Sequence, residues 1–257
     1  MFLIAYLCYA ATKFTIMIKF LNLFLFIGMI VMNYLANALP LNNKTTGELS
    51  DSFPNLFVPA GITFSIWGII YLLLALFCIA QFKESNKGIA EQIGWFFAVS
   101  CVLNGLWIVF WHYGKLPLSL VVMTGMLVSL IYINILIKDI PFGLIKASFG
   151  IYLGWISIAT IANVTALLVF YDWSRLGISE ETWTIIMIAA GVILTTLTVY
   201  RIQNPFIGLS VIWAFAGIAL KRQSDIKPVF IVALIALAIV AIVTVWGFYR
   251  KSTLEVS

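Results

Sequence analysis

The chain alternates between long runs of apolar residues and short polar breaks that carry almost all of its charges. A transmembrane helix needs about 20 largely apolar residues. Runs of about this length cover eight segments: 14–38, 57–82, 92–113, 116–137, 146–170, 182–200, 203–220 and 228–249. The pattern therefore predicts an all-α integral membrane protein with eight transmembrane helices.

The sixth and seventh predicted spans are separated only by the segment from Arg201 to Pro205. A continuous helix of about 40 residues would be about 60 Å long, roughly twice the apolar thickness of a bilayer. We therefore expect the two spans to form a helical hairpin that turns at this segment.

Residues 1–16 are apolar but are interrupted by Lys13, and no small-residue cleavage site follows them. They do not fit a cleaved signal peptide well. We interpret residues 1–16 as an extension that is either non-native, with Met17 as the natural start instead of Met1, or interfacial. A third reading is that they lengthen the first helix.

The composition supports lipid as the main solvent of the chain. Of its residues 63% are hydrophobic and 10% are charged, and the mean hydropathy is +1.09. A soluble domain carries roughly 25% charged residues, so a water-facing shell cannot be assembled here. The net charge of +5 comes from Lys and Arg scattered singly between apolar runs, which is typical of loop anchors and not of a nucleic-acid surface.

Lys and Arg are distributed unevenly between the two sides that eight spans create. With the N-terminus inside, the inner side holds nine: Lys13, Lys19, Lys83, Lys87, Lys138, Lys146, Arg201, Arg250 and Lys251. The outer side holds six: Lys44, Lys115, Arg175, Lys221, Arg222 and Lys227. Cytoplasmic loops carry an excess of such residues. The bias favours a multi-pass protein of a bacterial-type plasma membrane with both termini in the cytoplasm. The cluster of cations at residues 221–227, which this orientation places outside, favours the opposite orientation.

No Asp, Glu, Lys or Arg lies near the middle of a predicted span. The polar groups there are mainly the amides of asparagine and the hydroxyls of serine and threonine. Ion-coupled transporters usually need an intramembrane carboxylate, so its absence weakens a coupled-transport function. Five asparagines lie away from the span ends: Asn22, Asn33, Asn104, Asn134 and Asn163. Buried amides need partners, so we expect them to join helices, with ligand contact as the alternative.

Tryptophan is frequent, and its nine residues fall into two groups. Five lie near span ends and fit an interfacial belt: Trp95, Trp111, Trp173, Trp183 and Trp246. Four lie deeper: Trp67, Trp107, Trp155 and Trp213. Deep indoles indicate either a pocket for a flat apolar ligand or plain packing, and both readings stay open here.

Signatures of catalysis and of metal binding are missing from the chain. There is no GxSxG, HExxH, phosphate loop or pair of carboxylates within a span. His112 is the sole histidine, and Cys8, Cys78 and Cys101 have no metal-ligand spacing. We assign no catalytic residue and no metal site, and do not expect an enzyme.

Three segments carry a resemblance to a known family. They are VPAGITFSIWGIIY at residues 58–71, LNGLWIVFW at 103–111 and YLGWISIATIAN at 152–163. In order and spacing they resemble the second, third and fifth helices of the tryptophan-rich sensory protein (TspO) family, also called the translocator protein or peripheral benzodiazepine receptor family. The segment NYLANALP at 33–40 is similar to the end of that family's first helix.

The resemblance implies a TspO-like five-helix membrane domain over residues 17–172. It leaves residues 173–257 as a C-terminal membrane extension of three helices. The family binds porphyrins, sterol-like lipids and aromatic ligands in a pocket under its first loop. Matched positions carried over as ligand-binding residues are Trp67, Tyr71, Asn104, Trp107, Tyr152, Trp155, Ala159 and Asn163. Trp155 matches the pocket tryptophan associated with photo-oxidative porphyrin breakdown.

One departure concerns the ligand clamp. The family usually carries a tryptophan just after the prolines that precede its second helix, where this chain has Gly61 and Ile62. One aromatic side of the clamp is therefore missing, and tetrapyrrole affinity does not follow automatically.

The leading hypothesis is a membrane receptor or sensor that binds a flat hydrophobic ligand, a tetrapyrrole or a lipid, in an aromatic intramembrane pocket. A transporter or permease for a small amphipathic solute and a porphyrin-photo-oxidising activity remain alternatives. Porphyrin or haem would be a ligand, and no cofactor is otherwise expected. The expected partners are the lipid bilayer and the ligand, without nucleic acid. A homodimer is a further expectation from the family, unless the added helices cover the usual dimer face.

Overall fold

The structure is a computed structural model that describes the backbone of residues 2–39 and 41–256 and the side chains of residues 15–39 and 41–250. Two residues named above lie outside the described residues. They are Met1, the first of the two alternative starts, and Pro40, which we expected in the break after the first span. Within the described ranges all regular secondary structure is helical, which confirms the predicted fold class.

Each predicted span corresponds to one long helix. These are α1 (Phe2–Ala38), α3 (Ile66–Ala80), α4 (Lys87–His112), α5 (Leu116–Leu136), α6 (Leu144–Phe170), α7 (Glu180–Ile202), α8 (Phe206–Arg222) and α9 (Lys227–Val256). Short helices occupy the connections: η1 (Leu41–Asn43), α2 (Thr46–Asp51), η2 (Gly61–Ser65), η3 (Glu84–Asn86) and η4 (Arg175–Gly177). Helix α1 is continuous through residues 2–16, as the third reading of that segment expected.

Helix α8 departs from the prediction of eight full spans. In the described part of the chain seven helical stretches are long and apolar enough to cross a membrane, with η2 and α3 counted together as Gly61–Ala80, and α8 is not among them. Its 17 residues give a length of about 26 Å, short of the roughly 30 Å of the hydrocarbon core. It packs closely against α6 and α9, so neighbouring helices cover much of it, while Leu209, Trp213 and Leu220 stay exposed.

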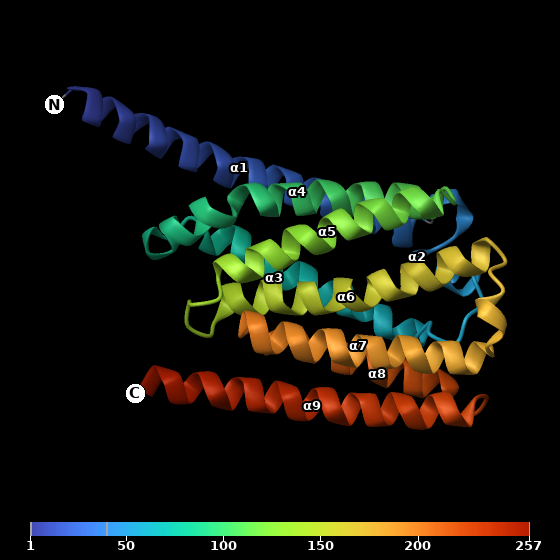
Figure 1. The fold of residues 1–257 in the computed structure, drawn as a ribbon. Coiled ribbons are helices and arrows are strands. Elements are labelled where there is room, and N and C mark those ends of the chain that lie inside the picture. The colour runs from blue at the N-terminus through green and yellow to red at the C-terminus, as the bar shows by residue number, and fades with distance from the viewer. Residues whose placement is uncertain (1, 40, 257) are drawn as a thin grey trace.

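The long helices run roughly side by side in alternating directions, with both termini at the same end of the bundle (Figure 1). Helix α4 packs on α1 and α5, α6 packs on α5, α3 and α8, and α9 packs on α7 and α8. The opposite end carries α2 and the connections 113–115, 171–179 and 223–226. We call it the loop end.

The turn between α7 and α8 confirms the predicted hairpin. Gln203 ends α7 in the left-handed conformation, with φ 56°. The next residue, Asn204, donates from Nδ2 to Asn134 Oδ1 at 2.7 Å and to the Lys146 carbonyl at 2.9 Å. These bonds anchor the hairpin to α5 and α6.

The outer surface of the bundle is apolar. Phe24 on α1, Val121 on α5 and Ile242 on α9 are 72%, 68% and 70% exposed. A surface of this kind is stable when lipid covers it, in agreement with an integral membrane protein.

A GxxxG pair brings α6 and α8 close together. A Cβ on Gly154 would collide with the Ile207 carbonyl and the Ser210 side chain, and one on Gly150 would collide with Asn204 and Phe206. Small residues at this spacing let two helix backbones approach closely. The short helix α8 is therefore held against the helix that carries Trp155.

Candidate functional site

A polar network lies in the bundle beneath the predicted site. Asn33 Nδ2 donates to Asn104 Oδ1 at 2.7 Å, and Asn104 Nδ2 donates to Tyr152 Oη at 2.9 Å. The Tyr152 hydroxyl donates to the Met126 sulfur at 3.0 Å. Asn104 and Tyr152 are fully buried. These bonds join α1, α4, α5 and α6, and they fix the floor of the site.

Above this floor, aromatic rings from α3, α4 and α6 converge on Trp67. Its ring centroid lies 6.4 Å from that of Trp107, 6.1 Å from Trp155 and 6.0 Å from Tyr152. Tyr71, one turn further along α3, stacks on Trp67 at 5.4 Å. Edge-to-face and stacked pairs of this kind stabilise aromatic clusters, so the rings hold one another in fixed orientations.

The cluster borders a cavity of about 40 Å³, which we call the aromatic cavity. The cavity is lined by Thr46, Ser50, Pro59, Phe64, Trp67, Trp107, Trp111, Trp155, Ile158, Ala159, Ala162 and Asn163. No charged side chain belongs to this lining. The walls come from α3, α4 and α6, and the cover comes from α2 and the segment that follows it.

The residues predicted as ligand-binding divide into two layers. Five of them line the cavity: Trp67, Trp107, Trp155, Ala159 and Asn163. The other three, Tyr71, Asn104 and Tyr152, are not part of the lining. They support it from below through the stacking on Trp67 and the hydrogen bonds of the floor.

Several polar atoms at the cavity lack a partner among the described residues. They are the indole Nε1 atoms of Trp107, Trp111 and Trp155, the Asn163 amide Nδ2 and the Thr46 hydroxyl. Most buried donors in proteins are hydrogen-bonded, and an unmet one is costly. Four unpaired N–H donors on one uncharged cavity suit a guest that offers hydrogen-bond acceptors.

Trp111 corrects the sequence-based assignment. We predicted it as part of the interfacial belt, but it is 4% exposed and lines the aromatic cavity. It stacks on Trp107 with ring centroids 5.8 Å apart. Residues four apart share a helix face, so the W-x-x-x-W spacing could have revealed it.

An aromatic residue near Gly61 and Ile62 lines the cavity although these two do not. Both of these residues are exposed, whereas Phe64 lines the cavity and meets Trp155 edge to face at 6.0 Å. Sequence reasoning missed Phe64 because its place depends on the path of η2. It also missed Thr46, Ser50 and Pro59, since no local pattern predicts which loop residues cover a cavity.

Trp213 is separate from the site. We grouped it with the deep indoles, but it is 40% exposed and does not line the cavity. Its Nε1 donates to the Thr63 carbonyl at 2.8 Å, and the Ala60 amide donates to the Gly217 carbonyl at 3.0 Å. Trp213 thus helps α8 to hold η2 in place.

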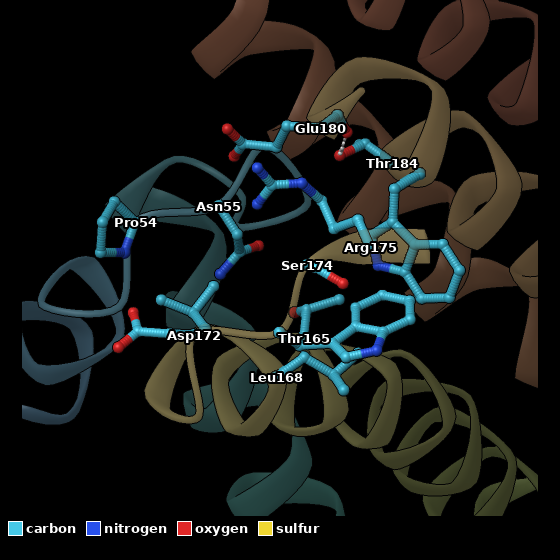
Figure 2. Close-up of a pocket in the computed structure, with 12 residues that line it drawn as sticks. Pro54, Asn55, Thr165, Leu168, Asp172, Ser174, Arg175, Glu180 and Thr184 are labelled. Atoms are coloured by element: carbon cyan, nitrogen blue, oxygen red, sulfur yellow. Dashed lines mark hydrogen bonds between the residues drawn. The ribbon is translucent and has the colours of Figure 1, made fainter. Parts of the chain in front are cut away.

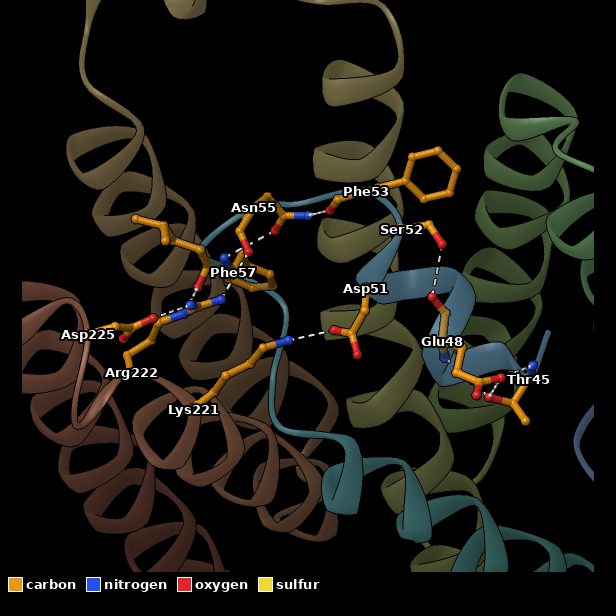
Figure 3. A network of polar contacts seen from close by, with 11 residues as sticks. Thr45, Glu48, Asp51, Ser52, Phe53, Asn55, Phe57, Lys221, Arg222 and Asp225 are labelled. Atoms are coloured by element: carbon orange, nitrogen blue, oxygen red, sulfur yellow. Dashed lines mark hydrogen bonds and ion pairs between the residues drawn. The ribbon is translucent and has the colours of Figure 1, made fainter.

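The cover of the aromatic cavity is residues 46–60, which we call the capping segment. Lys221 Nζ lies 2.6 Å from Asp51 Oδ1. Arg222 donates to the carbonyls of Leu56 and Asn55, each at 3.2 Å, and pairs with Asp225 at 2.7 Å. Figure 3 shows both cations reaching from the end of α8 toward the capping segment. The end of α8 therefore fixes the cover.

Two carboxylates beside these contacts have shifted pKa values. The Thr45 backbone N–H, and then its hydroxyl, donate to Glu48 in a capping box and lower the pKa of Glu48 below 4.5. For Asp225, slight burial opposes the shift, but the hydrogen bond from Arg222 prevails and lowers the pKa below 3.8. Both groups therefore stay ionised near neutral pH.

The described side chains contain no group of three or more His, Cys, Asp or Glu that could hold a metal ion. Cys78 and Cys101 are buried free thiols. The chemistry available at the aromatic cavity is consequently apolar contact, ring stacking and hydrogen-bond donation.

The family of the chain follows from comparison of its sequence with known proteins. No curated protein and no solved structure matches it. The family model of the TSPO-like proteins matches residues 19–246, which includes α7, α8 and most of α9. The division of the chain at residue 172 stays a prediction. Because the match spans well over half of the 257 residues, the chain belongs to the TSPO-like protein family.

Proposed function

We propose that this membrane protein is a receptor or sensor that binds a flat hydrophobic ligand in the aromatic cavity. The observation that carries the proposal is that four residues lining one uncharged, ring-lined cavity, Trp107, Trp111, Trp155 and Asn163, have side-chain N–H groups without a partner among the described residues. Ring faces favour a flat apolar body, and the donors favour a ligand with acceptor atoms. A tetrapyrrole or a lipid with polar oxygens has both properties.

The size of the cavity adds a requirement. Ligand sites for drug-sized molecules usually enclose about 300–1,000 Å³, whereas this cavity encloses about 40 Å³. A tetrapyrrole is too large for a cavity of this volume. Binding requires the capping segment or Phe64 to move outward, and the cover is the part of the lining that is outside the packed helices.

The proposal is tested by quenching of tryptophan fluorescence with protoporphyrin IX in detergent. The wild type should show saturable quenching. A Trp155→Phe, Asn163→Leu double variant makes one ring smaller and removes two donors, so saturation should be lost or shifted by at least tenfold in concentration. The matched control is Trp246→Phe, since Trp246 lies on α9 and is 44% exposed.

Non-saturable quenching that is equal in all three proteins would mean simple partitioning and would exclude the proposed site. The same proteins in liposomes separate binding from transport. A receptor should bind protoporphyrin saturably without moving it across the bilayer.

The orientation belongs to the same proposal. Both chain ends lie at one end of the bundle, and by sequence position nine Lys and Arg accompany that end against six at the other. Under the positive-inside rule the termini face the cytoplasm. The aromatic cavity would then open towards the opposite side, and protease protection of tagged termini in sealed vesicles tests this.

A further inference from the structure

A second cavity lies at the loop end, and it is larger and more polar than the first. It encloses about 280 Å³ between the end of α6, the connection 171–179, the start of α7 and residues 54–55 (Figure 2). Its polar lining includes Asn55, Thr165, Asp172, Arg175, Glu180 and Thr184. We call it the polar cavity.

Arg175 is the residue of this cavity with unmet bonding capacity. Its Nε–H is buried and has no partner among the described residues. Figure 2 shows its side chain reaching across the cavity between Glu180 and Asn55. The ion pairs found among the described side chains do not include Arg175. The Arg175 residue as a whole is only half-buried, so the unmet donor is this one N–H group. A buried N–H without an acceptor is unfavourable, so an acceptor brought in by a ligand would stabilise it.

The backbone around Arg175 is held in an uncommon conformation. Asp172, Arg175 and Leu176 have φ values of 48°, 54° and 54°, in the left-handed region that residues other than glycine rarely adopt. Such conformations persist when the surrounding structure enforces them and cluster at ligand-binding sites. The connection therefore sets the direction in which the Arg175 side chain leaves the backbone.

The two cavities are neighbours along α6. Ala162 and Asn163 line the aromatic cavity, and Thr165 and Leu168 line the polar cavity. These residues lie on different faces of the helix, but a third cavity of about 500 Å³ shares Ser50 with the lining of the aromatic cavity and Pro54, Asn55 and Glu180 with that of the polar cavity. One extended ligand can reach from one cavity to the other through it once the capping segment moves.

We propose that the polar cavity binds the acidic end of an amphipathic ligand whose flat apolar body occupies the aromatic cavity. This inference rests on the proposed function and adds the chemical class of the ligand. The guanidinium fork matches the two oxygens of a carboxylate or a phosphate. Asp172 and Glu180 weaken the attraction of small free anions, so the apolar body must supply part of the affinity.

The test compares protoporphyrin IX with its dimethyl ester, which has the same ring but no acid. Binding of both is measured on wild type, Arg175→Gln and Lys115→Gln. Lys115 is an exposed cation of the loop end that does not line the polar cavity, so its variant controls for general charge. Wild type and Lys115→Gln should bind the acid roughly tenfold more tightly than the ester. In Arg175→Gln this ratio should fall to about threefold or less, with ester affinity unchanged.

Three results overturn the inference. Equal affinity of the wild type for acid and ester shows that no group recognises the acid. An equal loss of acid and ester binding in Arg175→Gln assigns the residue to the fold. If the wild type still binds the ester saturably, either of these results leaves the proposed function intact. If the wild type binds neither probe saturably, both proposals are overturned.

Discussion

Lys221 Nζ lies 2.6 Å from Asp51 Oδ1, although 170 residues separate the two in the chain. This contact ties the last turn of α8 to α2, whose residues Thr46 and Ser50 cover the aromatic cavity. Helix α8 supplies no residue to the cavity lining itself. The short helix thus acts on the site through its neighbours: the capping segment, η2 and α6.

Breaking this ion pair should loosen the cover more than the fold. The Lys221 and Asp51 side chains are 28% and 58% exposed, and such pairs contribute about 0.2–1 kcal/mol. We expect Asp51→Asn to lower the free energy of unfolding by less than about 1 kcal/mol and to speed amide hydrogen exchange within residues 46–60. Exchange in α4 should not change. Identical exchange in variant and wild type would show that the pair does not hold the cover.

Arg222 should matter more than Lys221. It is 8% exposed and donates to two carbonyls of the capping segment as well as to Asp225. Arg222→Gln leaves those acceptors unmet, so the free energy of unfolding in detergent should fall by about 1–3 kcal/mol. Arg222→Lys should rescue little, because an ammonium lacks the planar fork. Full recovery of the free energy of unfolding in Arg222→Lys would mean that the positive charge alone stabilises the capping segment.

The fold was largely predictable from the sequence because lipid imposes a simple rule on the chain. Apolar runs of about 20 residues and polar breaks located the long helices, and the hairpin at Arg201–Pro205 followed from helix length. The shortfall of α8 was not predictable from hydropathy. Its burial against α6 and α9 depends on tertiary packing at Gly150 and Gly154, which a hydropathy count does not measure.

The candidate site was predictable only in its helical part. Trp67, Trp107 and Trp155 lie at one cavity, as their matched positions suggested. The cover was not predictable, because Phe64 and Pro59 are positioned by contacts with residues of α8 that lie 150 or more residues away in the chain, such as that of Trp213 with Thr63. Arg175 was counted only as a loop cation, since its burial depends on how the connection folds back on α6 and α7.

The close approach of α6 and α8 gives a further prediction. A Cβ on Gly154 would overlap the Ile207 carbonyl, and backbone atoms cannot move aside cheaply. Gly154→Ala should therefore destabilise the protein by about 1–3 kcal/mol. Gly28→Ala on α1 is the control, since nothing lies within 4 Å of its Cβ position. The midpoint of thermal unfolding in detergent should be similar for the wild type and Gly28→Ala, and clearly lower for Gly154→Ala.

The capping segment should loosen in acid. The pKa of Glu48 is lowered from 4.5 in the folded protein by its bonds to Thr45, and that of Asp225 is lowered from 3.8 by Arg222. A lowered pKa means that these bonds stabilise the fold above the ordinary pKa and are lost as pH falls through the lowered value. Hydrogen exchange of residues 46–60, corrected for intrinsic rates, should be constant from pH 7 to about 4.5 and rise below it. Glu48→Gln should make the exchange rate depend less on pH below about 4.5. An unchanged increase in the exchange rate of this variant would show that Glu48 does not cause it.

Two buried asparagines provide the sharpest contrast between a ligand-contacting and a structural role. Asn134 Nδ2 donates to the carbonyls of Leu130 and Phe149, and its Oδ1 accepts from Asn204. Asn163 accepts one bond of 3.2 Å, from Ser119, and its Nδ2 has no partner among the described residues. Leucine has the same number and branching of side-chain heavy atoms as asparagine but is somewhat larger, so the comparison of the two sites under the same replacement isolates the polar atoms from the packing.

Asn134→Leu should lower the free energy of unfolding by about 1–3 kcal/mol, because it leaves Asn204 with an unmet donor. Asn163→Leu should leave that free energy unchanged or raise it by up to about 1 kcal/mol, because it removes a buried unpaired donor. The same variant should weaken saturable protoporphyrin binding by roughly threefold to tenfold. Unfolding in detergent and fluorescence titration measure the two quantities on one sample. Destabilisation of Asn163→Leu to the level of Asn134→Leu would show that its amide serves the fold, since only an amide kept for a ligand can be removed without loss of stability.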